Sequence, residues 1–514
     1  MSTAHATAPS GRTFFGHPIG LSTLFFTEMW ERFSYYGIRP LLVLFMAAAL
    51  ADGGFGIERS QASAIVGIYA ASVYLASLPG GWVADRLLGL RRAVMLGAVL
   101  ISLGHISIGT SSFLEARAPF FLGLIFIVLG TGLLKPNISA MVGDLYPEGG
   151  ARRDAGFSIF YVGINSGAVA GQLLTGLLGE KIGWHWGFGI AGVGMLLGLI
   201  WFAIAARPTL GDIGTDISRD PDPVKQARME KIMKLALAAG LGLLALVFVL
   251  AATGFFTINP QAVGRNMTYV LVATAALYFA YIFIAGGLNS EEKKRIVVIA
   301  ILFVFAAIFW AGFEQAPTSL NLFAADFTDR VVLGYEIPAI WFQNANSLCV
   351  VLFAPFFAAL WLKLGKRNAN PSSPTKFSLG LLFGGLGFAL MIIPANAILA
   401  SGGVLKVSPL WLLLSYAIQT IGELLLSPVG LSTMTKLSPR KYVGQMMGIW
   451  FLATSVGNLI AGLVGGNVDP EKLDQMPVVF IGTTVALIAA ALLLAALIPF
   501  IKKLIPNEDK LVGE

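Results

Sequence analysis

Residues 21–50 read LSTLFFTEMWERFSYYGIRPLLVLFMAAAL, an apolar stretch with Glu28, Glu31, Arg32 and Arg39 near its centre. A helix that spans a bilayer needs about 20 mainly apolar residues, so this stretch is long enough to cross a membrane. Each charge in the middle of such a helix costs roughly 2.5–3.5 kcal/mol on insertion scales. A span carries that cost only where its charges pair, face water or have a function.

The composition of the whole chain indicates a polytopic helical membrane protein. Of 514 residues, 56% are hydrophobic and 12% are charged, whereas soluble proteins have about 25% charged residues. The single cysteine, Cys349, excludes an internal disulfide and a cysteine-ligated metal site. The four histidines leave little for a histidine-based site. The net charge of +7 is open to an anionic partner, but positive loop charge for membrane orientation explains it better.

Apolar runs of spanning length recur along the chain, and we expect fourteen transmembrane helices in an all-α fold. Residues 1–20 lack an apolar core, so the first span is expected to serve as the insertion signal. The expected limits are 19–50, 61–84, 91–112, 118–142, 156–180, 186–206, 232–256, 267–287, 295–322, 338–364, 377–400, 409–433, 443–465 and 477–503.

The distribution of Lys and Arg between the loops predicts the orientation. With fourteen spans, both termini lie on one side, which carries 25 of the 35 Lys and Arg residues, against 7 on the other side. The remaining three, Arg32, Arg39 and Lys135, lie within spans. Since cytoplasmic loops are enriched in Lys and Arg, both termini are predicted to be cytoplasmic.

The polar stretch 207–230 separates six spans from eight, and spans seven and eight carry few ionisable residues in their apolar cores. We expect those two spans to face lipid. This pattern favours a transporter built from two six-helix bundles with an inserted hairpin. The predicted parts are a tail (1–18), a first bundle (19–206), a linker with the two-helix insertion (207–294), a second bundle (295–503) and a tail (504–514).

The loop after the second span carries a cluster of charges. Residues 80–92 read GGWVADRLLGLRR, which resembles the G-x-x-x-D-R-x-G-x-R-R loop of the major facilitator superfamily. In that superfamily the Asp and Arg latch neighbouring helices in one state of transport, which implies a latch role for Asp85, Arg86 and Arg91. The alternative is ordinary positive-inside charge.

Helical geometry places the charges of the first span on one face. Glu28, Arg32, Tyr36 and Arg39 follow one another at spacings of 4, 4 and 3, so they share a face over three turns. A self-neutralising Glu28–Arg32 pair that fills a helix contact is the structural alternative. Glu31 and Tyr35 lie beside this face. The second cation, Arg39, and the two phenols favour a wet cavity that holds a charged ligand.

Other spans add Lys135, Glu314 and Glu423. Cations come only from the first half and these two acids from the second, so a cavity between the halves is expected to have oppositely charged walls. A zwitterion such as a peptide suits these walls, with its carboxylate near Arg32, Arg39 or Lys135 and its ammonium near Glu423. Each candidate aromatic is as compatible with helix packing as with ligand contact. The candidate amides and aromatics are Asn165, Asn346, Tyr35, Tyr36, Tyr74, Trp310 and Trp450.

The excess of carboxylates suggests coupling to protons. A low dielectric favours the neutral form of a glutamate, whereas a nearby arginine favours its charged form. An arginine that alternates between glutamate and a substrate carboxylate would link proton and substrate. His105, in the third span, is assigned to packing.

Several motifs together resemble the proton-dependent oligopeptide transporter (POT/PTR) family. Residues 28–37 are similar to its E-x-x-E-R-F-x-Y-Y-G signature, and residues 160–167 to F-Y-x-x-I-N-x-G. Further matches are Lys135, Trp310-x-x-x-Glu314-Gln315, Glu423-x-x-x-Ser427-Pro428-x-Gly430-Leu431 and Gly448-x-Trp450-Phe451-Leu452. Phe313 stands where some members have a second acid, so a role of that acid is not expected.

The resemblance implies import of di- and tripeptides with protons across a bacterial inner membrane, with peptide-like drugs as further candidate substrates. It implies no enzyme activity, no cofactor other than the proton, no nucleic-acid partner and a monomer. Lys135 and Glu423 are also predicted to pair as a cytoplasmic gate. By analogy, coupling falls to Glu28, Glu31, Arg32 and Glu314. Peptide binding falls to Tyr35, Tyr36, Arg39, Tyr74, Lys135, Asn165, Trp310, Asn346, Glu423, Trp450 and Thr454.

Other functions remain open from the residues alone. The same scaffold carries nitrate or other small anions in some relatives, but those generally lack the complete acidic motif of the first span. A drug-efflux antiporter and a peptide receptor without transport are further alternatives. An enzyme has little support, because we find no Ser-His-Asp triad and no phosphate-binding loop in the sequence.

Overall fold

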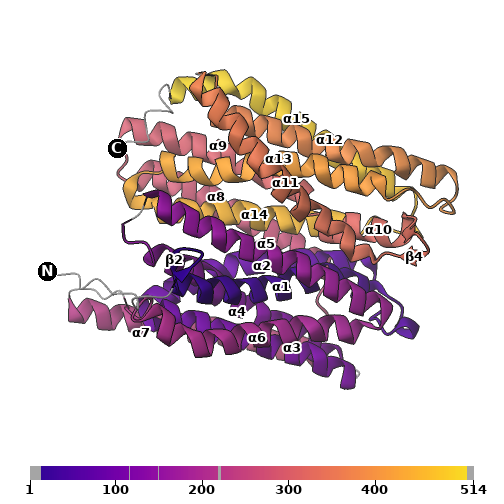
Figure 1. The fold of residues 1–514 in the computed structure, drawn as a ribbon, viewed down its shortest axis with the longest axis horizontal. Helices are drawn as coiled ribbons and strands as arrows, with labels where there is room; N and C mark the ends of the chain where they lie inside the picture. The colour runs from indigo at the N-terminus through magenta and orange to yellow at the C-terminus, as the bar shows by residue number, and fades with distance from the viewer. Residues whose placement is uncertain (1–12, 115, 149, 218–221, 368, 506–514) are drawn as a thin grey trace. The chain divides into compact units, whose positions relative to one another are not determined.

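The computed structural model describes residues 13–114, 116–148, 150–217, 222–367 and 369–505, so most of both predicted tails lies outside the described residues. Fourteen long helices of 23 to 32 residues and one short helix, α10, form this part of the chain (Figure 1). They are α1 (Gly20–Ala47), α2 (Arg59–Val83), α3 (Leu90–Phe113), α4 (Arg117–Asp144), α5 (Gly150–Lys181), α6 (Trp184–Leu210), α7 (Pro223–Ala252), α8 (Pro260–Ala285), α9 (Ser290–Phe313), α10 (Asn321–Phe327), α11 (Asn344–Lys366), α12 (Ser373–Ala400), α13 (Leu410–Leu437), α14 (Val443–Gly465) and α15 (Gln475–Leu504).

The predicted fourteen-span, all-α organisation is confirmed. Thirteen helical segments are long and apolar enough to cross a membrane. The fourteenth is α1, which has 28 residues but carries at least three ionisable residues in every 18-residue stretch. Strands in the described ranges form two short antiparallel hairpins, β1 (Thr13–Phe14) with β2 (His17–Pro18), and β3 (Val331–Val332) with β4 (Tyr335–Glu336).

The chain divides into two compact units whose borders fall inside α1 and α2. The first unit comprises residues up to Leu41 and Ser72–Asn259, and the second comprises Leu42–Ala71 and everything from Pro260. Helix α7 belongs to the first unit and α8 to the second. The most apolar stretch of α7 has no buried residue and that of α8 is 11% buried, as expected of helices that face lipid. The six-two-six bundle division stays a prediction.

Glycines allow very close helix packing in both units. In the first unit, a Cβ added at Gly97 of α3 would lie 2.6 Å from the carbonyl oxygen of Gly130 in α4, and one at Gly130 would lie 2.6 Å from that of Gly97. In the second unit, Gly380 of α12 and Gly422 of α13 oppose each other in the same way, at 2.9 and 2.6 Å. Such reciprocal contacts bring two backbones together where lipid provides no hydrophobic drive.

The ninth predicted span is broken in the middle. Helix α9 ends at Phe313, a π-helical turn covers Ala316–Leu320, and α10 follows from Asn321. The amide of Leu320 donates to the carbonyl of Gln315, five residues back, at 3.2 Å. Pro317 lies in this turn and lacks an amide hydrogen, which contributes to the break. The break places Glu314 at a helix end, where backbone groups are less committed.

Candidate functional site

The charges of the opening motif form a buried cluster in the first unit. Arg32 Nε lies 2.8 Å from Glu28 Oε1 and 2.7 Å from Glu31 Oε2. All three side chains are at most 3% exposed. The guanidinium also lies 5.7 Å from the centroid of the Tyr35 ring. The Glu28–Arg32 pair, which was the structural alternative to a ligand site, therefore exists, but Glu31 makes it a triad.

Both carboxylates contact the same guanidinium nitrogen. Nε of arginine carries one hydrogen, which Arg32 donates to Glu28 at 2.8 Å. Glu31 Oε1 also accepts a hydrogen bond from Thr131 of α4 at 3.3 Å. The two glutamates therefore compete for one donor. Protonation of one of them is expected to strengthen the contact of the other with Arg32.

Lys135 lies near this cluster on α4. Its Nζ stacks 4.1 Å from the centroid of the Tyr74 ring of α2, and its charge attracts Glu31. A cation over an aromatic face is stabilised by the ring quadrupole. Two residues predicted to bind peptide, Lys135 and Tyr74, are thus in contact beside a predicted coupling residue.

The remaining polar residues of α1 are also placed by the structure. The Tyr35 and Tyr36 rings meet edge to face at 5.2 Å, Tyr35 is buried and Arg39 is 7% exposed. His105 of α3 is buried, and its Nε2 lies 2.5 Å from Ser34 Oγ of α1. A helix-to-helix hydrogen bond agrees with the packing role predicted for His105.

The motif at residues 160–167 lies in α5, and its glycines allow close helix packing. A Cβ added at Gly163 would lie 2.9 Å from the Phe25 ring, and one at Gly167 would lie 2.9 Å from the Met29 carbonyl carbon. These glycines therefore let α5 pack directly on the α1 motif. Asn165 is half-buried, and its Nδ2 donates to the Tyr161 carbonyl at 2.9 Å.

The loop motif between α2 and α3 forms a π-helical turn over Ala84–Leu88. Asp85 is exposed and Arg86 half-buried. Arg91 Nη2 donates to the carbonyls of Ala206 and Gly211 at 2.8 Å each, which ties the start of α3 to the end of α6. Of the three predicted latch residues in this loop, Arg91 is the one whose bonds join two helices here.

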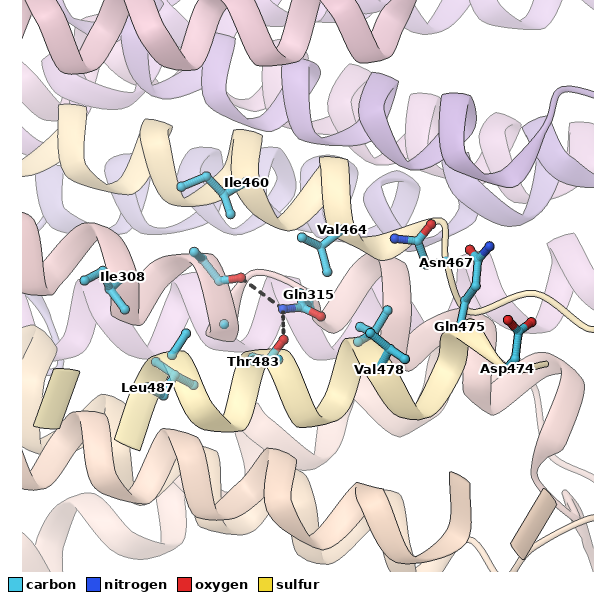
Figure 2. Close-up of a pocket in the computed structure, with 15 residues that line it drawn as sticks. Ile308, Gln315, Ile460, Val464, Asn467, Asp474, Gln475, Val478, Thr483 and Leu487 are labelled. Atoms are coloured by element: carbon cyan, nitrogen blue, oxygen red, sulfur yellow. Dashed lines mark hydrogen bonds between the residues drawn. The ribbon is translucent and has the colours of Figure 1, made fainter. Parts of the chain in front are cut away.

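In the second unit, Gln315 stabilises the break that follows α9. Its Nε2 donates to the Ala311 carbonyl at 3.2 Å and to Thr483 Oγ1 of α15 at 3.0 Å, as Figure 2 shows. Its Oε1 accepts from Ser319 at 2.8 Å. One amide side chain thus bridges both sides of the break and the neighbouring helix, which fixes the position of Glu314. Glu314 is 7% exposed.

The second acid of this unit, Glu423 of α13, is held by an amide. Asn346 Nδ2 of α11 donates to Glu423 Oε2 and to Thr420 Oγ1, at 3.0 Å each. Glu314 lies near enough to Glu423 to act on it electrostatically. The structure therefore brings the predicted residues Asn346 and Glu423 into direct contact.

The predicted aromatics of the second unit are packed. Trp310 is 8% exposed and lies 5.5 Å from the Phe309 ring and 5.6 Å from the Phe313 ring. Trp450 is 4% exposed and meets Phe377 at 6.4 Å. Thr454 is buried, and its hydroxyl donates to the Trp450 carbonyl at 3.4 Å. The contacts described for these three side chains are all with other residues of the second unit.

A cavity of about 550 Å³ lies in the second unit between α9, α14 and α15. Apolar side chains such as Ile460 and Leu487 lie toward one end, and Asn467 and Asp474 lie at the other (Figure 2). None of the predicted site residues lines it, although Gln315 does. This cavity is therefore separate from the residues predicted to bind peptide.

One ionic cluster was not predicted as a site. Arg59, at the start of α2, pairs with Asp326 of α10 through Nη1, and its Nε lies 3.7 Å from Asp469 Oδ1. The orientation count treats Arg59 as loop charge. The signal that reveals this cluster is Asp326, an acid inside the apolar run NLFAADF. Thr131, Thr420 and Thr483 also escape prediction, because isolated threonines are common in membrane helices.

Comparison with known proteins identifies the family. The model of the POT family matches residues 91–476. The peptide transporter YePEPT of Yersinia enterocolitica subsp. palearctica serotype O:3 is 50% identical over 97% of each chain. The di-/tripeptide transporter of Lactococcus lactis subsp. cremoris is 40% identical over 87% of this chain and 89% of its own.

A solved structure of a peptide transporter is also similar to this chain. The crystal structure of peptide transporter POT in complex with sulfate has a TM-score of 0.87 and 40% identity, and the match covers 97% of this chain and 98% of that one. This likeness confirms the predicted all-helical major facilitator fold. The chain is a multi-pass membrane protein that belongs to the POT family of peptide transporters.

Proposed function

We propose that the chain imports di- and tripeptides together with protons, driven by the inward proton gradient. The di-/tripeptide transporter of Lactococcus supports the substrate class. The observation that carries the coupling is the single Arg32 Nε shared by Glu28 and Glu31. A proton on one glutamate commits the guanidinium to the other, so protonation selects the partner of Arg32.

The division of labour follows the local contacts. Glu28, Glu31, Arg32 and Glu314 handle the proton. Lys135, held over Tyr74, offers its charge to the peptide carboxylate, and Glu423, held by Asn346, offers its charge to the ammonium. The other proposed peptide contacts are Tyr35, Tyr36, Arg39, Asn165, Trp310, Trp450 and Thr454. A Lys135–Glu423 gate stays a prediction, as does latching by Asp85 and Arg86.

The setting of this activity is part of the proposal. The protein acts as a monomer in the bacterial inner membrane, with both termini in the cytoplasm, and carries peptide-like drugs as secondary substrates. The charge distribution over the loops supports this orientation. It uses no cofactor besides the proton.

The test is uptake of a labelled dipeptide into proteoliposomes with an imposed inward proton gradient. The unaltered protein should accumulate peptide. Glu31→Gln and Glu314→Gln should lose gradient-driven accumulation, because an amide cannot take up the coupled proton, while peptide counterflow persists. Glu148→Gln is the control, because Glu148 is half exposed and lies 3.6 Å from Arg152 in the same unit as Glu31.

Full accumulation by Glu31→Gln and Glu314→Gln would contradict the coupling roles. Binding of peptide by the unaltered protein without any flux would instead identify a receptor. Loss of preloaded peptide from the proteoliposomes under the same inward proton gradient, without uptake, would identify a proton-driven efflux antiporter.

A further inference from the structure

A second cavity, of about 370 Å³, lies where α11, α12 and α13 meet in the second unit. Its walls carry hydroxyl groups from the start of α12 and from α13, namely Ser372, Ser373, Ser432 and Thr433. Two lysines, Lys376 and Lys436, complete the polar lining. The proposed transport cycle uses none of these residues.

The cavity contains a buried cation. Lys376 of α12 is only 9% exposed, and its Nζ lies 4.2 Å from the centroid of the Trp361 ring of α11. The ring face stabilises the ammonium and fixes its position. Lys436, near the end of α13, is exposed and adds a second positive charge to the rim.

Acidic residues are rare in this part of the sequence. Between Glu336 and Asp469 the sequence has one acid, Glu423, and it accepts a hydrogen bond from Asn346. Helix α12 begins at Ser373, so its positive dipole end and its first amide groups lie at this cavity. The Thr433 hydroxyl donates to the Val429 carbonyl at 2.7 Å and Ser372 pairs with Thr375 at 2.9 Å. The Ser373 hydroxyl, the two ammonium groups and the helix start form a set of donors suited to an anion that carries several acceptor oxygens.

The surroundings favour a ligand that belongs to the bilayer. Only 6% of the most apolar stretch of α11 is buried, and large side chains such as Phe356 and Leu362 on this helix are 64% and 69% exposed. Apolar surface that leads to a basic cavity matches an acyl chain that ends in an anionic headgroup.

We propose that this cavity binds a phosphate group, supplied by the headgroup of an anionic phospholipid. Lys376 contacts the phosphate directly, Lys436 strengthens the attraction at the rim, and the Ser373 hydroxyl donates to a phosphate oxygen. Free inorganic phosphate has the same chemistry and is the other source. The site is distinct from the peptide residues, so it stands whether or not the chain transports peptides with protons.

The lipid arm of the test measures how strongly the full-length protein retains spin-labelled phosphatidylglycerol in phosphatidylcholine bilayers. Lys376→Gln and Lys436→Gln should each lower the relative association constant about fivefold, the effect of one lysine near an anionic headgroup. Lys376→Arg should retain most of it. Lys363→Gln is the matched control, because Lys363 is an exposed lysine of α11 that does not line the cavity.

The phosphate arm titrates inorganic phosphate into the detergent-solubilised protein. Binding that Lys376→Gln abolishes would support the site and assign free phosphate as its source. Retention of phosphatidylglycerol by the unaltered protein without phosphate binding would assign the lipid. If Lys376→Gln lowers the thermal unfolding midpoint, the exposed Lys436→Gln decides. The proposal is overturned if Lys436→Gln binds phosphatidylglycerol and phosphate as strongly as the unaltered protein does, and a folded Lys376→Gln protein also loses no binding of either probe.

Discussion

The two compact units treat buried charge differently. In the first unit, two carboxylates contact one guanidinium, and all three groups are almost completely buried. In the second unit, Glu423 is bound by the neutral amide of Asn346, and Glu314 lies next to a helix break supported by Gln315. In both units, nevertheless, two helices pack closely through glycines that face each other.

The contrast separates two tasks. A buried ion cluster depends strongly on every member, because the loss of one partner leaves an uncompensated charge. An acid bound by an amide keeps a hydrogen bond whether it is charged or neutral. The first unit is therefore expected to be sensitive to any change in its charge balance, and the second to tolerate protonation of Glu423.

The largest expected effect is the removal of Arg32. Arg32→Ala should destabilise the protein by about 3–5 kcal/mol, because Glu28 and Glu31 would lose their shared counter-ion. Glu423→Gln should cost about 1 kcal/mol or less, since an amide can still bond to Asn346. The thermal unfolding midpoints of the two variants in the same detergent measure the difference.

A control with retained charge sharpens this test. Arg32→Lys should recover part of the midpoint lost in Arg32→Ala, but not gradient-driven uptake, because an ammonium lacks the fixed fork of the guanidinium. If Glu423→Gln destabilises the protein as much as Arg32→Ala, the contrast between the units is wrong.

Glycine packing should give a smaller effect of equal size in both units. Gly97→Val and Gly422→Val insert side chains where a Cβ would already lie within 2.6 Å of an opposing carbonyl oxygen, so each should cost about 1–3 kcal/mol. Gly240→Val in α7 is the control, because a Cβ there meets nothing within 4 Å. If only one of the variants Gly97→Val and Gly422→Val lowers the unfolding midpoint of the protein, the packing in the two units is not equivalent.

The smallest effect is expected at Glu58, just before α2. The neighbouring Ser60 hydroxyl and a hydrogen bond from Lys472 hold the pKa of Glu58 below its ordinary value. The folded pKa is therefore lower than the unfolded one, so this contact stabilises the protein above the unfolded pKa and is lost as pH falls through the folded value.

Because both partners are about half exposed, solvent screening limits the contribution to a few tenths of a kcal/mol. Glu58→Gln should lower the unfolding midpoint slightly at neutral pH, and the difference should vanish in acid. A difference that grows on acidification would contradict the direction of the shift.

The all-helical membrane fold is predictable from the sequence, because membrane helices are recognised by their length and apolarity. The charges of α1 remained visible for the same reason, since each one stands out against an apolar background. The Glu28–Arg32 spacing of four residues also allows the ion pair that the structure contains, which the sequence offered as the structural alternative.

Contacts between distant helices could not be predicted in this way. Thr131 bonds to Glu31, and Thr483 bonds to Gln315, yet neither threonine has a sequence neighbour that signals its partner. The sequence presents Arg59 only as a loop charge, because its partners, Asp326 and Asp469, come from parts of the chain more than 260 residues away. Helix periodicity fixes faces, whereas pairing depends on how helices are rotated against one another.

The π-helical turn at Ala316–Leu320 has a consequence for the phase of the span. Each residue of an α-helix advances about 100° around the axis, and a π-helical turn holds one residue more than an α-helical turn. Helix α10 is thus out of phase with α9 by one residue, and this offset sets the side on which Asp326 meets Arg59. A single codon in the gene therefore decides which face of α10 carries its acid.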